Sequence, residues 1–240
     1  MIQFRAVLTA FASLAAIGAF AALPPATAVA APAKAPDWNR RIVATPEGGW
    51  LIGNPAAPVK LIEYASYTCP HCAHFMAEGM PIVRRDYIAT GKVSLEFRQF
   101  ALNPIDLTEG MLVRCTATPA AAVALGEKMF ADQQAILDRA PDEATGERLS
   151  ATPPAQLHTA LAQAMKLDEW ATKNGLPAPR VKACLADLSL RDRIVAIRGK
   201  AIESYDIQGT PSFVLNGKAL EKTFNWQALE PQLKAAVAGK

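Results

Sequence analysis

Two cysteines separated by two residues are the part of this sequence best suited to chemistry. Cys69, Pro70, His71 and Cys72 follow a compact apolar run, residues 59–65, and open a segment of helical character. A cysteine pair at this spacing can close a small disulfide, bind a metal ion or catalyse redox exchange. At the start of a helix, unpaired amide protons and the helix dipole stabilise a thiolate. This placement favours redox catalysis.

The two sulfurs are expected to have different roles, because they lie at different positions in the predicted helix. Cys69, at the helix tip, is the predicted exposed nucleophile that forms a mixed disulfide. Cys72, one turn further, is the predicted buried resolving thiol. His71 can give the Cys69 thiolate a hydrogen bond or a positive charge. A lower Cys69 pKa makes the disulfide more oxidising, by about 30 mV for each pKa unit below ambient pH.

A plain structural disulfide and a metal site are the alternatives for this cysteine pair. A zinc site with four ligands requires a second close pair of Cys or His. Cys115 and Cys184 are far apart in sequence, and only His74 lies near the pair. A copper-binding module, built on the pair and a nearby histidine as soft ligands, stays open as a non-enzymatic alternative. We predict neither a resident metal nor a cofactor.

The composition is typical of a globular protein with one ordinary domain plus an insertion, or with two small domains. The 240 residues are 51% hydrophobic and 20% charged, which is too apolar for a disordered chain. There are 25 Lys and Arg against 22 Asp and Glu, and the net charge of +3 forms no basic block. We therefore expect no nucleic-acid partner.

The N-terminal segment has the order of a secretory signal peptide. Arg5 precedes an uncharged, alanine-rich run over residues 6–23, and a proline pair and an A-x-A site ending at Ala30 follow. We predict a signal peptide over residues 1–30, cleavage after Ala30 and a periplasmic location. A retained membrane anchor is the alternative, because the run approaches the roughly 20 residues that span a bilayer.

The rest of the chain is predicted to form two halves of a small sheet domain around a helical block. The first half has a strand at 59–65, a helix at about 69–89 bent by Pro81, and a strand from 93 to about 102. A right-handed crossover makes these two strands a parallel pair. Later helices are expected at residues 118–137, 152–165, 179–188, 190–204 and 225–237. A strand is expected at residues 212–215, and a hairpin turn at 216–217.

The predicted fold class is α/β, with a helical domain inserted between a β-α-β half and a β-β-α half. The segment after the signal peptide is expected to be a surface leader with one short strand near residues 41–43. The predicted boundaries are 31–56 for the leader, 57–104 for the first half, 105–204 for the insertion and 205–240 for the second half.

Residues 53–64 lead into the C-P-H-C motif, and a G-T-P-S-F segment occupies residues 209–213. These segments resemble the thioredoxin superfamily, and within it the DsbA-like thiol-disulfide oxidoreductases of the bacterial cell envelope. The likeness covers nearly all of the chain after residue 30, because that family also carries a helical insertion in its thioredoxin fold. It implies a protein that introduces disulfides into reduced or unfolded exported polypeptides and is reoxidised by a membrane partner of the DsbB type.

The resemblance gives three further residues a role. Pro211 matches the family's cis-proline beside the active disulfide, and Thr210 matches the residue whose backbone binds an extended substrate. Glu63 matches a buried acid that assists proton transfer for the resolving cysteine, and its apolar neighbours favour a raised pKa.

The threonine at position 210 keeps a second function open, because the best-studied DsbA oxidases carry Val there and several isomerases carry Thr. A disulfide isomerase or reductase is therefore the alternative. The N-terminal dimerisation domain of the DsbC and DsbG families has no counterpart in the sequence, and we expect a monomer.

Cys115 and Cys184 both fall in the predicted helical block. In an oxidising compartment two leftover thiols are expected to bond, which would give a structural disulfide across a loop of about 70 residues. A second redox pair is the alternative. His158 has no evident partner and is expected at the surface or at a helix cap.

Overall fold

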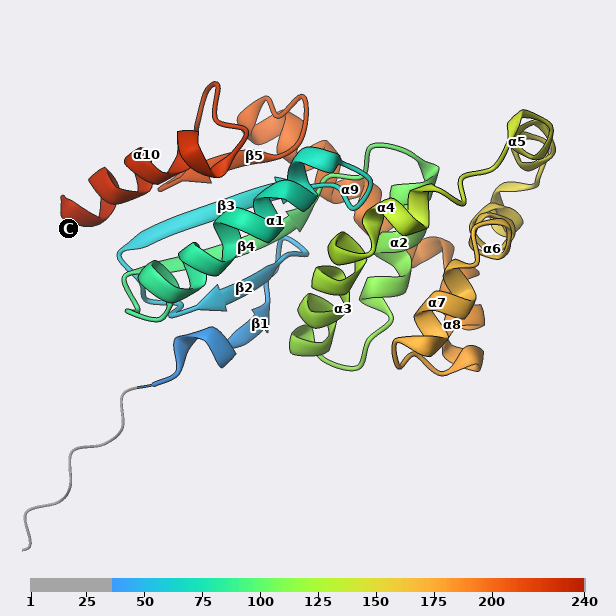
Figure 1. The fold of residues 1–240 in the computed structure, drawn as a ribbon, viewed down its shortest axis with the longest axis horizontal. Helices are drawn as coiled ribbons and strands as arrows, with labels where there is room; N and C mark the ends of the chain where they lie inside the picture. The colour runs from blue at the N-terminus through green and yellow to red at the C-terminus, as the bar shows by residue number, and fades with distance from the viewer. Residues whose placement is uncertain (1–35, 240) are drawn as a thin grey trace, which may run out of the picture. The chain divides into compact units, whose positions relative to one another are not determined.

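The computed structural model describes residues 36–239, and the predicted signal peptide lies outside them. In the described part, one sheet has the strand order β1-β2-β4-β3-β5-β6 (Figure 1). Its strands are β1 (Ile42–Ala44), β2 (Trp50–Gly53), β3 (Val59–Ala65), β4 (Val93–Gln99), β5 (Ser212–Leu215) and β6 (Lys218–Ala219). No helix within residues 36–239 combines the length and hydrophobicity needed to cross a membrane.

The centre of the sheet is the parallel pair β3 and β4, as the sequence predicts. The two strands are in register with Glu63 opposite Phe97, and β5 pairs antiparallel with the other side of β3. Asn216 and Gly217, both with positive φ, turn the chain from β5 into β6. This confirms the predicted hairpin, because both positions of such a turn need the left-handed region.

The helix after β3 crosses one face of the sheet and returns the chain to β4 (Figure 1). It is α1 (Pro70–Ile82), followed by a π-helical turn, η2 (Val83–Ile88). Pro81 has no amide proton to donate, and the regular α-helical pattern ends just after it. The last helix, α10 (Trp226–Ala238), packs against α1 and covers part of the same core.

The predicted leader contributes two strands to the sheet rather than one. β1 lies where the short strand is expected, whereas β2 is not predicted. β2 pairs antiparallel with β4, with Trp50 opposite Phe97, and Trp50 and Ile52 are buried. The backbones approach so closely that a Cβ on Gly49 would lie 2.7 Å from the Phe97 carbonyl oxygen. A four-residue strand among Gly and Pro gives little sequence signal.

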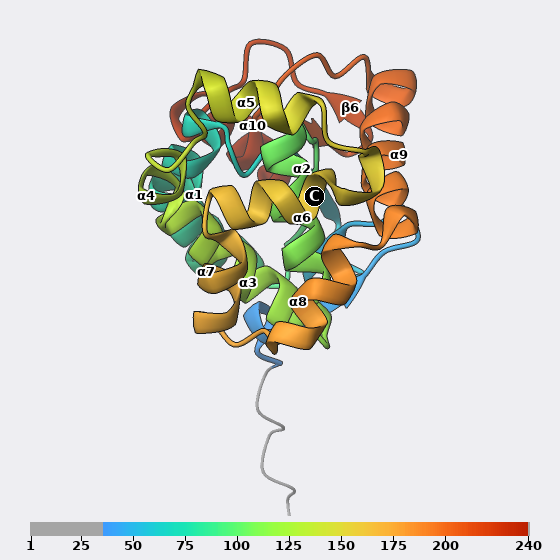
Figure 2. The same cartoon turned by 90° about the vertical axis from the view of Figure 1, so that its right-hand side faces the viewer.

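Between β4 and β5 the chain forms the predicted helical insertion, which Figure 2 shows from the side with α9 along one edge. Side chains of Asn103, Thr118 and Asp187 cap α2, α3 and α9 at their N-termini. The helices α2, α5 and α7 are not individually predicted, and the single helix expected at 118–137 is two helices, α3 and α4. The helices are α2 (Pro104–Arg114), α3 (Pro119–Ala131), α4 (Gln133–Leu137), α5 (Glu143–Ser150), α6 (Pro154–Ala164), α7 (Leu167–Lys173), α8 (Ala178–Leu185) and α9 (Leu188–Tyr205).

Cys115 and Cys184 are joined by a disulfide, with their Cα atoms 6.1 Å apart. The bond connects the end of α2 to α8, across 69 residues of sequence. Beside it, the Arg180 Nε donates a hydrogen bond of 3.0 Å to the Cys115 carbonyl oxygen. The first helix of the block is thereby fixed to α8.

His158 is buried, so the expectation of a surface or capping residue is wrong. It is 3% exposed, and its Nδ1 lies 2.8 Å from the Thr108 hydroxyl. That hydroxyl donates its own proton to the Pro104 carbonyl oxygen, so the imidazole N–H donates to the threonine oxygen. The partner is 50 residues away in sequence, on α2, which packs against α6.

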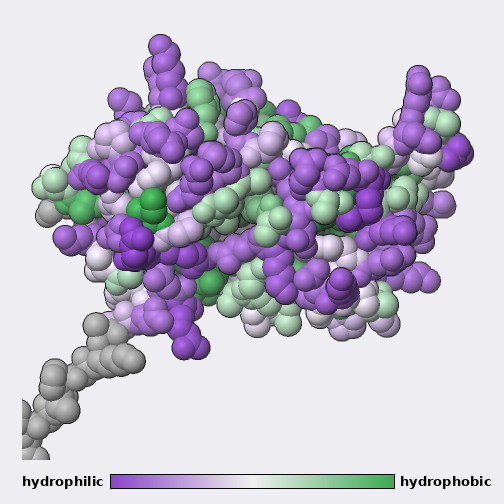
Figure 3. Space-filling model, viewed as in Figure 1, coloured by the Kyte–Doolittle hydropathy of each residue, from purple (hydrophilic) through white to green (hydrophobic). Residues whose placement is uncertain are grey.

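The surface in Figure 3 is mainly hydrophilic, and strongly hydrophobic residues occupy small separate areas. Inside, buried side chains of the sheet and of the helical block belong to one continuous core. Phe97 of β4, for example, packs against Phe130 of α3, with ring centroids 6.2 Å apart. The insertion is therefore packed onto the sheet and shares its core.

Candidate active site

The cysteine pair lies where β3 ends and α1 begins. Cys69 is the N-cap residue of α1, and its carbonyl oxygen accepts hydrogen bonds from the amides of Cys72 (3.1 Å) and Ala73 (3.2 Å). Pro70 occupies the first helical position, where the missing amide proton costs no hydrogen bond. The Cys69 sulfur is thereby placed at the helix start that the sequence predicts.

Both cysteines are buried, so the prediction of an exposed Cys69 is wrong. Cys69 is 6% exposed and Cys72 is 0% exposed. The backbone of Thr210 lies against Cys69, and the Cys69 Sγ lies 3.3 Å from the Thr210 carbonyl oxygen, to which the thiol donates when it is protonated. Thr210 and Cys69 are 141 positions apart in sequence, so the local helix pattern could not predict that Thr210 buries Cys69.

The two thiols differ sharply in acidity. The pKa of Cys69 is lowered to about 5, chiefly by the hydrogen bond from the Cys72 thiol, against the opposing effect of burial. The Thr210 hydroxyl and the amides of Cys72 and His71 lower it further. Burial raises the pKa of Cys72 far above its ordinary value, and the charge on Cys69 adds to that rise. At neutral pH, Cys69 is a thiolate and Cys72 a thiol.

His71 contributes to this acidity through its backbone. Its amide is among the groups that lower the pKa of Cys69, whereas its imidazole, which the sequence suggests as a donor or a charge, is not. The His71 side chain is exposed, as is Pro70. These two residues form the outer surface of the motif.

Glu63 lies on β3 between Phe97 of β4 and Phe213 of β5. It is completely buried, and neither carboxylate oxygen has a hydrogen-bond partner among residues 36–239. Burial raises the pKa of Glu63 to about 8, and the Cys69 thiolate adds to this rise. An acid that keeps its proton at neutral pH beside this pair can give that proton to a sulfur.

The Thr210–Pro211 peptide bond is cis, as the resemblance implies. Pro211 is buried directly before β5, whose Ser212 pairs with Tyr64 of β3. Because β3 continues into the cysteine motif, this pairing brings Thr210 against Cys69. The hydroxyl oxygen of Thr210 is buried and has no other hydrogen-bond partner among the described residues, so its proton is available to the Cys69 thiolate.

Two side chains of the helical block hold the active-site loop, and sequence reasoning does not find them. The Gln133 amide donates to the carbonyl oxygens of Tyr67 (2.7 Å) and Cys69 (3.0 Å). Asp106 accepts a hydrogen bond of 3.0 Å from the Tyr67 amide. Asp106 follows the N-cap Asn103 and resembles an ordinary first-turn acid, and Gln133 gives no signal in the sequence.

In the part of the chain from 36 to 239, no three His, Cys, Asp or Glu side chains are grouped as a metal site would require. The exposed His74, which the copper alternative invokes, instead has its Nε2 3.0 Å from the Glu78 carboxylate one turn later.

Residues 45–235 match the family model described as thioredoxin. The chain belongs to the thioredoxin family. The crystal structure of a protein-disulfide isomerase from Novosphingobium aromaticivorans is 31% identical, with a TM-score of 0.75, and the match covers 78% of this chain and 96% of that one. With its helical insertion, this thioredoxin-family chain is a DsbA-like member of the superfamily.

More distant comparisons agree with the fold. The crystal structure of Wolbachia pipientis alpha-DsbA1 has a TM-score of 0.64 at 22% identity and covers 82% of this chain and 94% of its own. A protein-disulfide oxidoreductase of Rickettsia prowazekii is 25% identical over 184 residues, which are 71% of this chain and 55% of that relative. This thioredoxin-family chain spans about half the length of the curated relatives it matches first.

Proposed function

We propose that this protein is an exported thiol-disulfide oxidoreductase that introduces disulfides into other polypeptides through Cys69 and Cys72. The observation that carries the proposal is the difference in acidity within the pair. The pKa of Cys69 is about 5, whereas that of Cys72 is strongly raised. A thiol that leaves readily as a thiolate makes the disulfide containing it easy to reduce. The oxidised pair is therefore a strong acceptor of electrons.

The first step of the proposed reaction is attack on the oxidised pair. A substrate thiolate attacks the Cys69 sulfur, the Cys69–Cys72 bond breaks, and Cys72 leaves as a thiolate. Glu63, protonated at neutral pH, gives its proton to Cys72 and later recovers one from the solvent. The mixed disulfide between substrate and Cys69 remains.

The second step releases the product. A second substrate thiolate attacks the substrate sulfur of the mixed disulfide, and Cys69 leaves as a stable thiolate. The substrate gains one disulfide, and the cysteine pair gains two electrons. A membrane partner of the DsbB type then reoxidises the pair, and no further cofactor enters the cycle.

The proposed substrate is a reduced or unfolded exported polypeptide bound as an extended segment beside Thr210 and Pro211. An extended segment can pair with main-chain groups there and needs little side-chain selection. The disulfide between Cys115 and Cys184 supports an oxidising compartment, as does the predicted signal peptide. We place the protein in the periplasm as a monomer.

Oxidation of reduced, unfolded ribonuclease tests the proposal directly. Cys69→Ser removes the attacked sulfur and should abolish disulfide formation in the substrate. The Cys115→Ala, Cys184→Ala double variant is the control, and it should retain the activity, because its cysteines lie outside the reacting pair. Undiminished oxidation by Cys69→Ser would exclude the proposed role of the motif.

An isomerase or reductase is the second candidate. Thr210 precedes the cis-proline, and the structural relative from Novosphingobium is described as a protein-disulfide isomerase. The reduction potential of the Cys69–Cys72 pair separates an oxidase from a reductase, and the ratio of oxidase to isomerase activity separates an oxidase from an isomerase. We expect a potential clearly above that of thioredoxin, which is about −270 mV. A value near or below that of thioredoxin would favour the reductase, and isomerase activity that exceeds oxidase activity would favour the isomerase.

A further inference from the structure

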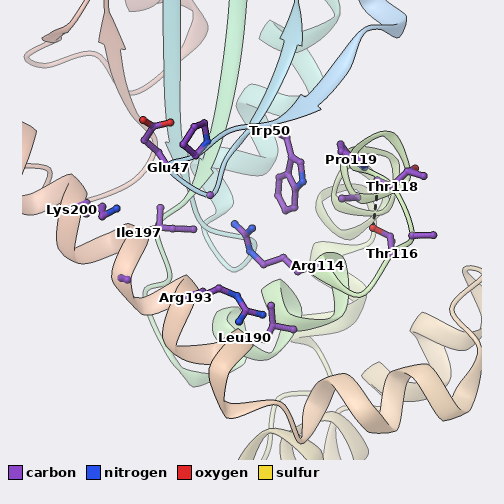
Figure 4. A pocket seen from close by; sticks show the side chains of 15 residues that line it. Glu47, Trp50, Arg114, Thr116, Thr118, Pro119, Leu190, Arg193, Ile197 and Lys200 are labelled. Carbon is purple, nitrogen blue, oxygen red and sulfur yellow. Dashed lines mark hydrogen bonds between the residues drawn. The ribbon is translucent and has the colours of Figure 1, made fainter.

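A cavity of about 460 Å³ lies between the edge of the sheet and the helical block (Figure 4). Its walls come from the turn before β2, the end of α2, the start of α3 and one side of α9. Neither the cysteine pair nor Thr210 and Pro211 belong to its lining. The lining residues that matter for its chemistry are Glu47, Trp50, Arg114, Arg193, Ile197 and Lys200.

Arg114 is the unusual residue of this cavity. Its guanidinium stacks on the ring of Trp50, 4.5 Å from the ring centroid, and its Nε and Nη2 are buried without a hydrogen-bond partner among residues 36–239. These two nitrogens form the edge that binds an oxyanion through two parallel hydrogen bonds. Arg98 uses that same edge to bind the Glu96 carboxylate, at 2.7 and 2.9 Å. In Arg114 the edge lacks its acceptor.

The charge around Arg114 is not balanced by the protein. Arg193 and Lys200 line the same cavity, and burial together with the nearby charge of Arg193 lowers the pKa of Arg114. Glu47 is the acid of the lining, but it lies 3.8 Å from Arg98. Arg193 has an exposed partner 3.9 Å away, Asp187, and exposed pairs of this kind contribute little. The cavity keeps an excess of positive charge.

We propose that this cavity binds a small organic anion, with its carboxylate or phosphate group between Arg114 and Arg193. The apolar body of the ligand packs against the apolar part of the wall, which includes Trp50, Leu190 and Ile197. The Nε and Nη2 edge of Arg114 is shielded from solvent in this structure. The flexible side chain therefore turns towards the cavity when it binds the anion. Residues 1–36 contain no Asp or Glu, so their side chains cannot supply the anion.

Calorimetric titration with benzoate, phenyl phosphate and inorganic phosphate tests the site. The two aromatic anions should bind and should raise the unfolding temperature with concentration, because ligands stabilise the state that binds them. The difference between benzoate and phenyl phosphate identifies the preferred headgroup, and inorganic phosphate measures the contribution of the apolar wall. Benzamidine, a cation of the same shape as benzoate, should not bind. Equal binding of benzamidine and benzoate would overturn the proposal, as would absence of binding by both aromatic anions.

Substitutions of single arginines test whether the anions bind in this cavity. Arg193→Gln and Arg114→Gln should each weaken anion binding about tenfold or more, through loss of a charge-assisted contact. Arg198→Gln is the matched control, because Arg198 lies on the same helix but stacks over Phe100 outside the cavity, and it should bind like the wild type. Arg193 is exposed, so its variant keeps the test decisive even if Arg114→Gln fails to fold.

Anion binding in this cavity can be tested independently of the proposed redox function. A Cys69→Ser, Cys72→Ser double variant has no redox pair but has an intact cavity, and it should bind the anions with unchanged affinity. If Arg198→Gln weakened binding as much as Arg193→Gln, the anions would respond only to the net charge of the surface, and the cavity would not be their site.

Discussion

Cys69 and Cys72 become unequal mainly through each other. The helix start supplies amides that lower the pKa of Cys69, as the sequence predicts, but the largest effect is the hydrogen bond from the Cys72 thiol. The deep burial of Cys72 keeps its own proton in place, so that it can donate this bond. A single helical turn therefore provides both the stable thiolate and the thiol that stabilises it.

This acidity predicts how the stability of the reduced protein depends on pH. The folded pKa of Cys69, about 5, is depressed from about 9, so folding of the reduced protein is favoured where the thiolate exists. Relative to the oxidised form, the reduced form should gain stability, by a few kcal/mol, as pH rises from 5 to 9, and should lose this gain as pH falls towards 5. Denaturant unfolding of both redox forms, together with thiolate absorbance, measures the effect. The oxidised form has no such thiol, and an identical pH dependence in the two forms would contradict the prediction.

Glu63 should have the opposite influence on how the stability of the folded protein depends on pH. Its folded pKa of about 8 is raised from 4.5, so the folded state holds more protons and loses stability as pH rises between these values, by an upper bound of about 5 kcal/mol. Glu63→Gln should remove this slope, which unfolding curves at several pH values would reveal. It should also slow the release of Cys72 in stopped-flow experiments. The exposed Glu78→Gln serves as the control with unchanged kinetics, and an unchanged slope in Glu63→Gln would contradict the assignment.

At the scale of elements, the sequence predicts what local patterns determine. β3 and β5 stand out as short, mostly apolar runs, and the turn after β5 follows from Asn216 and Gly217. β2 is missed because its four residues become a strand only against β4, more than 40 positions later. The burial of Cys69 and of His158 is missed for the same reason, since the residues that cover them come from distant elements.

Gln133 shows how an element of the insertion supports the site, and it gives a test. Gln133→Leu should leave the carbonyl oxygens of Tyr67 and Cys69 without their donor, at a cost of about 1–3 kcal/mol. The looser loop should also change the rate at which iodoacetamide alkylates Cys69. Gln134→Leu is the matched control, because Gln134 is exposed and bonds only Asp138. Equal effects of the two substitutions on stability and alkylation would show that the loop does not depend on Gln133.

At the scale of the whole molecule, the candidate site needs three parts of the chain at once. β3 and α1 carry the cysteines and Glu63, the segment before β5 supplies Thr210, and the helical block supplies Gln133. β3, α1 and the helical block share one hydrophobic core, which also includes Phe213 of β5, so the insertion is a structural support of the site. The contribution of the disulfide in that block can therefore be separated from the chemistry of the motif.

The Cys115–Cys184 bond restricts the unfolded chain, and its removal should mainly reduce stability. Closing a loop across 69 residues contributes about 4 kcal/mol in the chain-entropy treatment. The Cys115→Ala, Cys184→Ala variant should unfold at a lower denaturant concentration by about this free energy. It should keep the reduction potential of the other pair, because neither residue contacts Cys69 or Cys72 through a hydrogen bond. A shifted potential with unchanged stability would instead identify Cys115 and Cys184 as a second redox pair, the alternative that their sequence leaves open.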